Sequence, residues 1–429
     1  MKSFSRLLAS AMLPTFFAMA SPVAAQAPNV AALGPEALSG LCLDKNDLNP
    51  ARRIMACTRL IEERKVQGRA LTEALTRRAE TYKSLGETSK ATADYRAVIA
   101  LLDSTIGARN DPTALFARGS AHRALGDVDR ALADYDEAIR LDTKYASALV
   151  ARGTLLASLK AEVRKAIADF DQVLALNPSS VEALTLRGDA YGLLGDHGRA
   201  LADLDRAVTL EPMNARAHVL QGLTLARLGN HEKAYVAYSK AIAIEPQNVE
   251  ALVNRSAIAA YQGDSGSAIR DLDIAIASEP GNALAHYNRG YARFAAKEFD
   301  AAISDYSAAI ALDPRLGWAY LNRCLTRAVL GKDLPQALAD CDEAMKLLPE
   351  NPEVRETRGF VFLKLNDADL ALLEYDSVLV ASPNRPLALY GRGLARARRG
   401  DVKGGIADKE AARALFADIG REFTPYGLQ

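Results

Sequence analysis

The sequence predicts an all-α protein built from about ten helical hairpins that follow one another along the chain. Prolines that recur with the same period as the hairpins mark helix ends, because proline cannot continue a helix. No stretch shows the period-two alternation of a half-buried strand. The clearest marker is a small residue that recurs every 34 or 35 residues, with one interval of 40: Ala79, Gly119, Gly153, Gly188, Gly222, Ser256, Gly290, Cys324, Gly359 and Gly393.

The composition excludes one class of partner. The chain has 53 basic and 53 acidic residues, and 49% of its 429 residues are hydrophobic. No basic block or stripe breaks this balance, so we expect no nucleic acid partner.

The first residues, 1–25, read as a secretory signal peptide. Lys2 and Arg6 precede an apolar run from Leu7 to Ala20. Val23, Ala24 and Ala25 then form a cleavage site of small residues before Gln26. The alternative is a membrane anchor, but the run is shorter than the roughly 20 apolar residues that span a bilayer, and Pro14 interrupts it. We expect cleavage after Ala25, a periplasmic or secreted protein, and no transmembrane segment in the mature chain.

Export changes how the four cysteines are interpreted, because an oxidising compartment permits disulfides. Cys42 and Cys57 precede the repeats, and a disulfide between them is favoured over two buried thiols. Cys324 and Cys341 belong to the two helices of one repeat, and there a disulfide and separate thiols both stay open.

Each repeat combines small and large residues in a fixed order. The small residue of the first helix is matched in the second by an alanine, and a large residue follows that can fill the remaining gap. The alanines are Ala131, Ala166, Ala200, Ala234, Ala268, Ala302, Ala337 and Ala371, and the large residues are Tyr95, Tyr135, Phe170, Leu204, Tyr238, Leu272, Tyr306 and Tyr375.

This order of small, small, aromatic, Ala and Pro at a period of 34 resembles the tetratricopeptide repeat (TPR) family. The cysteine-containing entry segment and the closing Phe423–Leu428 look like exported bacterial members of that family. The resemblance implies a right-handed superhelical solenoid over residues 70–415, with a concave face lined by first helices. Its ends need caps, so we assign 26–41 as a linker, 42–69 as an N-terminal capping segment and 416–429 as a C-terminal tail.

An arginine precedes nearly every small residue, where the commonest family pattern has leucine. An acid lies one residue before the large residue of the second helix. One repeat lacks both, since Gln221 stands in place of the arginine and Ala237 in place of the acid. Because the two are lost together, we predict that each arginine binds the carboxylate of its own or the adjacent repeat, as a structural ion pair. The main pairs are Arg118 with Asp134, Arg152 with Asp169, Arg187 with Asp203, Arg255 with Asp271, Arg289 with Asp305, and Arg323 with Asp340.

The family geometry turns some first-helix residues toward the groove, and toward the C-terminus these become apolar. Either a partner covers them or they pack against the neighbouring helix. The residues are Tyr287, Tyr291, Phe294, Trp318, Leu321, Leu325, Phe360 and Tyr390.

Asn254, Asn288 and Asn322 hold equivalent places in three successive repeats. In TPR proteins that bind peptides, asparagine at this position often holds the peptide backbone, which suits a group with one acceptor and two donors. The alternative is an asparagine that is merely tolerated at an exposed site.

No motif of nucleophilic, phosphate-binding or metal-dependent catalysis stands outside the repeat pattern, so we expect no enzyme, cofactor or metal. The sequence therefore predicts an exported adaptor or scaffold whose concave groove binds a protein or peptide partner. The alternative is a chaperone-like or regulatory subunit of an envelope enzyme or assembly machine.

Overall fold

The computed structural model describes residues 30, 33–44, 49–63, 65–106 and 111–420. These residues form twenty-two α-helices and no strand. The chain divides into two compact units, Met1–Lys160 and Ala161–Gln429. The predicted signal peptide lies outside the described residues.

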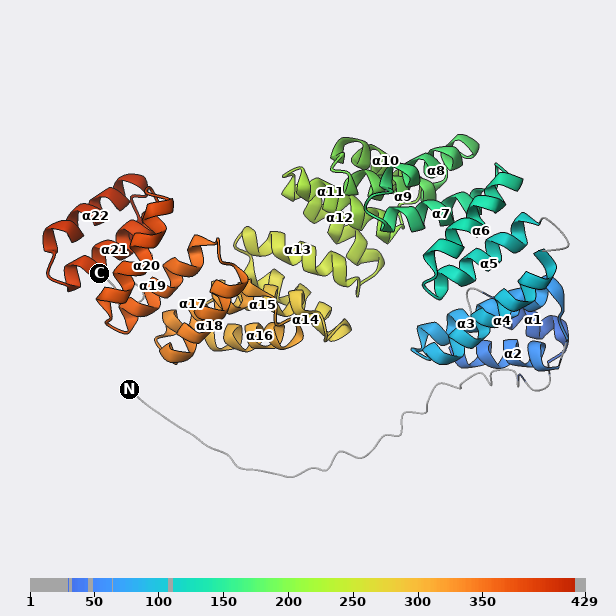
Figure 1. Ribbon diagram of the computed structural model, residues 1–429, viewed down its shortest axis with the longest axis horizontal. Helices are drawn as coiled ribbons and strands as arrows, with labels where there is room; N and C mark the ends of the chain where they lie inside the picture. The colour runs from blue at the N-terminus through green and yellow to red at the C-terminus, as the bar shows by residue number, and fades with distance from the viewer. Residues whose placement is uncertain (1–29, 31–32, 45–48, 64, 107–110, 421–429) are drawn as a thin grey trace, which may run out of the picture. The chain divides into compact units, whose positions relative to one another are not determined.

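Unit 1 consists of a short leading hairpin followed by repeat helices, drawn in blue to green in Figure 1. Successive helices contact each other in chain order. The helices are α1 (Pro35–Leu43), α2 (Pro50–Glu62), α3 (Gly68–Ser84), α4 (Thr88–Ile106), α5 (Pro112–Ala124), α6 (Val128–Leu141) and α7 (Ala146–Ser158).

The leading hairpin is stapled by a disulfide between Cys42 of α1 and Cys57 of α2, whose sulfurs are 2.07 Å apart. Both cysteines are buried with Leu38, Leu60 and Ala74 of α3, so the hairpin closes the exposed end of the first repeat. Helix α1 begins at Pro35, within the predicted linker 26–41, because its apolar residues are needed to cover α2 and α3.

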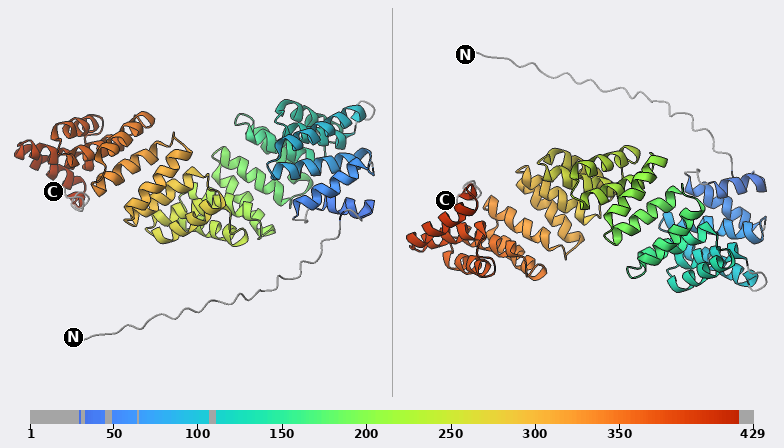
Figure 2. Two further views of the ribbon diagram at one scale, coloured as in Figure 1. Left: turned by 90° about the horizontal axis from the view of Figure 1, so that it is seen from below. Right: turned by 90° about the horizontal axis from the view of Figure 1, so that it is seen from above.

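Unit 2 continues the repeats from α8 to α22, and Figures 1 and 2 show its hairpins following one another. Its helices are α8 (Val163–Leu176), α9 (Val181–Leu193), α10 (His197–Leu210), α11 (Ala215–Arg227), α12 (His231–Ile244), α13 (Val249–Tyr261), α14 (Ser265–Ser278), α15 (Ala283–Ala295), α16 (Phe299–Leu312), α17 (Gly317–Leu330), α18 (Leu334–Leu347), α19 (Pro352–Lys364), α20 (Ala368–Ala381), α21 (Pro386–Arg398) and α22 (Val402–Leu415).

Nine helix pairs, α3 with α4, α5 with α6 and those from α9 with α10 to α21 with α22, correspond to nine of the predicted repeats. The remaining one, repeat 3, has its first helix α7 in unit 1 and its second helix α8 in unit 2, and the repeats are numbered 1 to 10 in chain order. The predicted all-α fold of stacked helical hairpins is confirmed. From Pro178 to Pro383, each recurring proline lies two residues past the last residue of a second helix, as the proline argument requires.

The turn inside a hairpin is set by glycine and an acid. Gly126 has φ +82°, a left-handed backbone that a side chain would strain, and it ends α5. Asp127 then caps α6, because its side chain accepts a hydrogen bond from the Arg130 amide. The same Gly-Asp chemistry recurs at Gly195, Gly263 and Gly400.

The two helices of a hairpin approach closely at the recurrent small residue. A Cβ atom on Gly290 would lie 2.7 Å from Cε1 of Tyr306, closer than atoms can come. The tyrosine ring therefore fills the space that glycine leaves, and the matching Ala302 is fully buried. This contact explains why small and large residues alternate between the helices.

The C-terminal end of unit 2 extends past α22. Ile419 is buried in one cluster with Tyr375 and Tyr390, so the first residues of the predicted tail 416–429 pack on the last repeats. Residues 421–429 lie outside the described part.

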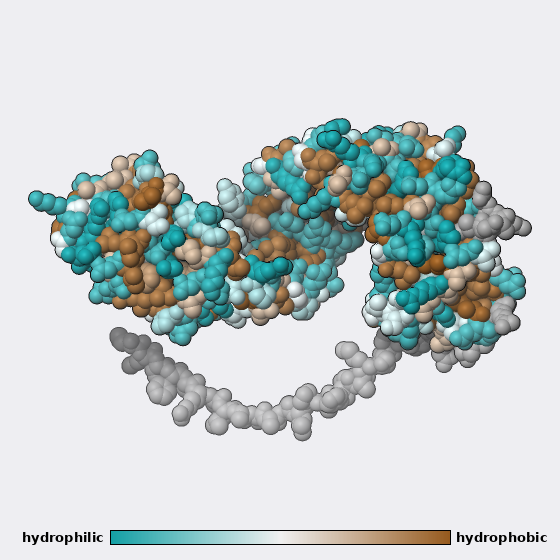
Figure 3. All heavy atoms as spheres, in the orientation of Figure 1, coloured by the Kyte–Doolittle hydropathy of each residue, from teal (hydrophilic) through white to brown (hydrophobic). Residues whose placement is uncertain are grey.

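None of the described helices combines the length and the apolar character that crossing a bilayer requires. Figure 3 shows that, on the face drawn, hydrophobic residues lie among hydrophilic ones in each unit.

Candidate functional site

The predicted arginines lie against the predicted acids, and repeat 4 shows the geometry. Nε and Nη2 of Arg187 on α9 donate to the two carboxylate oxygens of Asp203 on α10, each at 2.7 Å. The remaining nitrogen, Nη1, donates to Asp171 of α8 at 2.6 Å. One guanidinium therefore joins three helices, two from its own repeat and one from the repeat before.

The two-pronged bond to the acid of the same repeat recurs through both units. We call the set the arginine ladder. Its forked pairs are Arg78 with Asp94, Arg118 with Asp134, Arg187 with Asp203, Arg255 with Asp271, Arg289 with Asp305, Arg323 with Asp340, and Arg392 with Asp408.

Two members of the ladder differ. Arg358 reaches Glu374 through Nη2 at 2.8 Å. Arg152 donates to Asp136 at 2.7 Å within unit 1, whereas its predicted partner Asp169 belongs to unit 2, where it is buried.

The bond to the preceding repeat was missed by the sequence reasoning. Its acceptor lies two residues after the ladder acid, so a sequence signal existed: Asp or Ser recurs at that place with the period of the repeat. The arginines of repeat 3 and later repeats donate in this way to Asp136, Asp171, Ser239, Asp273, Ser307, Asp342 and Asp376. In repeat 2, Arg118 donates instead to Asp103 of the extended helix α4.

Repeat 5 explains the paired loss of arginine and acid. Gln221 donates to Asp205 of the preceding repeat at 2.7 Å. It keeps that link but has no forked partner, and the acid's position is taken by the buried Ala237. An acid there would be buried without a counter-charge, which is costly.

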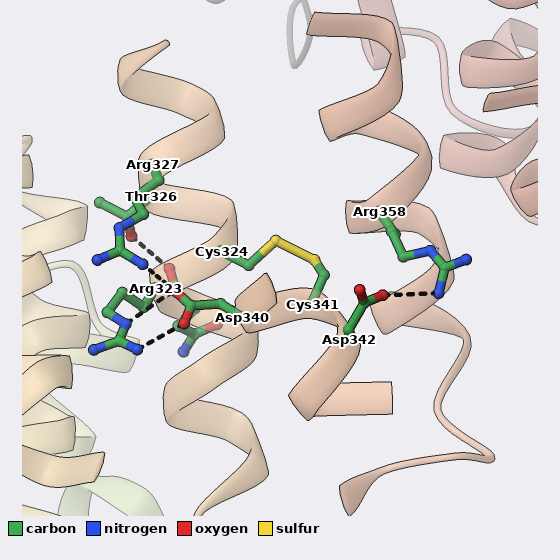
Figure 4. Close-up of a disulfide and its surroundings, with 9 residues drawn as sticks. Arg323, Cys324, Thr326, Arg327, Asp340, Cys341, Asp342 and Arg358 are labelled. Atoms are coloured by element: carbon green, nitrogen blue, oxygen red, sulfur yellow. Dashed lines mark hydrogen bonds and ion pairs between the residues drawn. A yellow bond between two sulfur atoms is a disulfide. The ribbon is translucent and has the colours of Figure 1, made fainter. Parts of the chain in front are cut away.

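Near the C-terminus the ladder acids receive a second arginine. Arg293 donates to Asp305 at 2.8 Å, and Arg396 to Asp408 at 3.0 Å. Figure 4 shows the same for Asp340, which faces both Arg323 and Arg327 of α17.

The ladder carries permanent charge. The hydrogen bond to Asp203 raises the pKa of Arg187, which is already far above neutrality. A guanidinium held in this way cannot act as a general acid or base at physiological pH, so the ladder is structural.

Cys324 and Cys341 form a second disulfide, with sulfurs 2.11 Å apart. Figure 4 shows it joining α17 and α18 beside Asp340. In repeat 8 the two cysteines occupy the places that Gly290 and Tyr306 hold in repeat 7, so a covalent bond replaces the contact between glycine and the ring.

Of the predicted groove residues, two aromatic side chains are exposed on first helices. Tyr291 of α15 is 49% exposed and Trp318 of α17 is 40% exposed. Leu284 of α15, which the sequence reasoning did not single out, is 50% exposed. It lies at the position in repeat 7 that Trp318 holds in repeat 8, so the period itself could have identified it.

For three other predicted groove residues the second alternative holds, that they pack against the neighbouring helix. Leu321, Phe360 and Tyr390 are only 3%, 6% and 3% exposed, because the neighbouring helices cover them. Leu321 packs with Val354 of the next first helix, and the other two lie in the C-terminal core cluster. Phe294 and Leu325 are partly buried against that same cluster.

The three asparagines lie half-buried on α13, α15 and α17. Asn254 donates to the carbonyl of Glu250 in its own helix at 2.8 Å, and Asn322 donates to the hydroxyl of Tyr287 at 3.1 Å. The side chain of Asn288 makes no hydrogen bond to any residue that the structure describes. We call Asn254, Asn288 and Asn322 with Leu284, Tyr291 and Trp318 the asparagine face.

Tyr287 lies behind the asparagine face, where it contacts Tyr306 and Asn322. Its ring centroid lies 6.0 Å from that of Tyr306, and burial raises the pKa of its phenol. By accepting from Asn322, it fixes the orientation of that amide.

Two histidines of unit 2 have structural partners. His218 and His286 approach the carbonyls of Pro212 and Pro280 at 2.9 and 3.2 Å, tying first helices to the preceding turns. Within the described ranges no cluster of His, Cys, Asp and Glu has the arrangement of a metal site.

The chain was compared with known proteins. Tetratricopeptide repeat models match residues 155–210, 185–249, 257–317 and 357–418, and a further one matches 112–145, together more than half of the chain. No curated protein matches the chain at a significant level.

Solved structures similar to the chain include some that are described as tetratricopeptide repeat proteins. A tetratricopeptide repeat protein from Parabacteroides merdae shares 18% identity over 58% of this chain and 98% of its own, with a TM-score of 0.46. YrrB, described as a TPR protein with an unusual peptide-binding site, shares 22% identity over 43% of this chain and 95% of its own, with a TM-score of 0.37. A chain of the APC/C hetero-tetramer Cut9–Hcn1 shares 16% identity over 92% of this chain and 87% of its own, with a TM-score of 0.49. From its family matches and its helical hairpins, the chain belongs to the tetratricopeptide repeat family.

Proposed function

We propose that this protein is an exported, non-catalytic adaptor that holds an extended segment of a protein partner on the asparagine face of unit 2. Tetratricopeptide repeat proteins commonly mediate protein interactions and are generally scaffolds. The observation that carries the proposal is the row of amides at equivalent positions of α13, α15 and α17, flanked by exposed apolar side chains.

The spacing of the amides suits an extended chain. Helix α15 packs against both α13 and α17, and packed helices have axes about 8–10 Å apart. An extended peptide advances about 3.3 Å per residue, so successive asparagines meet it about every third residue. An amide has both donor and acceptor atoms and can bond a peptide backbone whatever its sequence.

The apolar side chains supply affinity that backbone bonds alone lack. Tyr291, Trp318 and Leu284 each keep 40% or more of their surface exposed, and they lie on two adjacent first helices. Binding energy in protein interfaces concentrates in a few buried aromatic contacts, with Trp and Tyr prominent. A partner with apolar side chains would bury these three.

Export is supported by the cysteines and the leading residues. Both cysteine pairs lie at disulfide distance, as an oxidising compartment permits. Lys2, Arg6 and the apolar run that follows have the order of charged and apolar segments found in a signal peptide.

The proposal is tested by retention of envelope proteins on the immobilised chain, comparing wild type with Tyr291→Ser/Trp318→Ser. The matched control is Val380→Ser, which removes an apolar side chain that is 86% exposed on the second helix α20. We expect a partner retained by wild type and by the control but lost from the double variant. Equal retention by all three proteins contradicts the proposal, and retention of many unrelated unfolded chains favours a chaperone-like role.

A further inference from the structure

A large cavity lies in unit 1. It has a volume of about 780 Å³ and is lined chiefly by the first helices α3 and α5. A smaller cavity shares the wall residues Thr76, Glu80, Ser120 and Arg123, so the two form one continuous groove. We call it the N-terminal groove.

The groove follows from the one irregular interval of the sequence. The other second helices end seven residues after the ladder acid, whereas α4 runs on from Leu101 to Ile106. Leu101 and Leu102, at the start of this extension, line the cavity. Helices α3 and α5 make at most marginal contact with each other, and the cavity lies between them.

One end of the groove is apolar and aromatic. Phe116, Leu101 and Leu102 line it, and the ring of Phe116 lies 5.4 Å from that of Tyr145 and 5.9 Å from that of Tyr135, centroid to centroid. The rim arginines here are neutralised, since Arg69 and Arg77 each pair with a glutamate. This end suits a large apolar side chain.

The other end carries two cations without counter-ions. Lys83, Arg123 and Glu80 line it. Glu80 pairs with Arg77, whereas Lys83 and Arg123 form no ion pair with a residue that the structure describes. They hold the same place, four residues after the small residue of repeats 1 and 2. The other eight repeats have uncharged residues there: Ala157, Gly192, Ala226, Ala260, Phe294, Ala328, Leu363 and Ala397.

We propose that the N-terminal groove is a second peptide site, which takes an acidic side chain between Lys83 and Arg123 and a large apolar one against Phe116. The proposal goes beyond the asparagine face, because it concerns another unit and another chemistry. Charge complementarity selects the occupant, since two unpaired cations favour a carboxylate over a neutral or basic group.

The geometry also sets the spacing of the two side chains. Arg123 lies seven residues after Phe116 on one helix, which at about 1.5 Å per residue separates them by about 10 Å. An extended peptide covers that length in about three residues. The acidic and the apolar residue of the ligand therefore stand about three positions apart.

The test is fluorescence anisotropy with the full-length mature protein and labelled peptides containing Phe-Gly-Gly-Glu or, for the opposite direction, Glu-Gly-Gly-Phe. We expect one of them to bind at least about tenfold more tightly than the matching peptide with Lys for Glu, and less tightly at high salt. Lys83→Glu/Arg123→Glu should abolish this preference and favour the lysine peptide instead.

Arg96→Glu/Lys144→Glu is the matched control, because it makes the same charge change at exposed sites of unit 1 outside the groove. Circular dichroism checks that both double variants are folded. Tyr291→Ser/Trp318→Ser should leave the peptide affinity unchanged, which separates this site from the asparagine face. Equal binding of glutamate and lysine peptides, no binding of either, or equal losses in the two charge variants would overturn the proposal.

Discussion

The guanidinium of a ladder arginine satisfies acceptors on two second helices at once. Arg187 bonds Asp203 in its own repeat and Asp171 in the repeat before. Because Asp203 is buried, it depends on this one counter-charge. Removing one member of such a pair costs more than removing both.

We predict that Arg187→Leu lowers the free energy of unfolding by about 3 kcal/mol, whereas Arg187→Leu/Asp203→Leu lowers it by about 1 kcal/mol or less. Urea denaturation measures both. Arg199→Leu is the control: it breaks an exposed pair with Asp196, and the expected loss is under about 1 kcal/mol. Equal losses in the single and double variants at the Arg187 pair would show that these groups are not coupled.

The large tyrosines between hairpin helices give the protein an alkaline limit. Burial raises the pKa of Tyr135, Tyr238, Tyr306 and Tyr375 above the usual value. A group whose pKa is raised by folding stabilises the fold below its unfolded pKa, about pH 10, and loses that contribution as the pH rises further.

We therefore predict that these tyrosines ionise together with the loss of helical structure above about pH 10. Tyrosinate absorbance and circular dichroism, followed on one sample, measure the two events. Ionisation of every tyrosine near pH 10 with the helical signal intact would contradict the burial of the rings.

At the scale of the element, the hairpin of repeat 8 differs from its neighbours. Cys324 and Cys341 replace a small residue and an aromatic ring, and both are fully buried. The disulfide closes a loop of sequence separation 17, which by loop entropy contributes about 3 kcal/mol.

We predict that Cys324→Ala/Cys341→Ala lowers the free energy of unfolding by about 3 kcal/mol, and that Cys324→Gly/Cys341→Tyr recovers part of this loss. The tyrosine would pack on glycine as Tyr306 packs on Gly290. Urea denaturation under oxidising conditions measures both variants. A Gly/Tyr variant no more stable than the alanine variant would show that repeat 8 cannot accept the packing of its neighbours.

The hairpins could be predicted because their chemistry is local and repeated. Gly126, Asp127 and the recurring prolines act within a few residues of their own position, so their effect is visible in the sequence. The start of α1 at Pro35 could not be predicted in this way, since that helix depends on packing against α2 and α3.

The groove residues were harder to predict because exposure depends on the next repeat. Tyr291 and Phe360 hold the same position of their first helices, yet one is 49% exposed and the other 6%. Phe360 is covered by the C-terminal cluster, to which the last helices and Ile419 contribute. The repeat period predicts toward which face a side chain points, but not whether neighbouring helices bury it.

At the scale of the whole molecule, stability is a sum over neighbouring repeats, and function depends on surfaces that the repeats leave uncovered. The ladder, the disulfides and the ring contacts account for the cohesion of each unit. The asparagine face and the N-terminal groove are the surfaces with chemistry left to bind a partner.

The most direct test of the proposed function is photocross-linking in cells from a photoreactive residue placed at Tyr291. Glu182, an exposed residue of the first helix α9 in the same unit, is the control position. We predict that one protein partner is labelled from Tyr291 and not from Glu182. Equal labelling from both positions, or none from either, would contradict the assignment of the asparagine face as the binding surface.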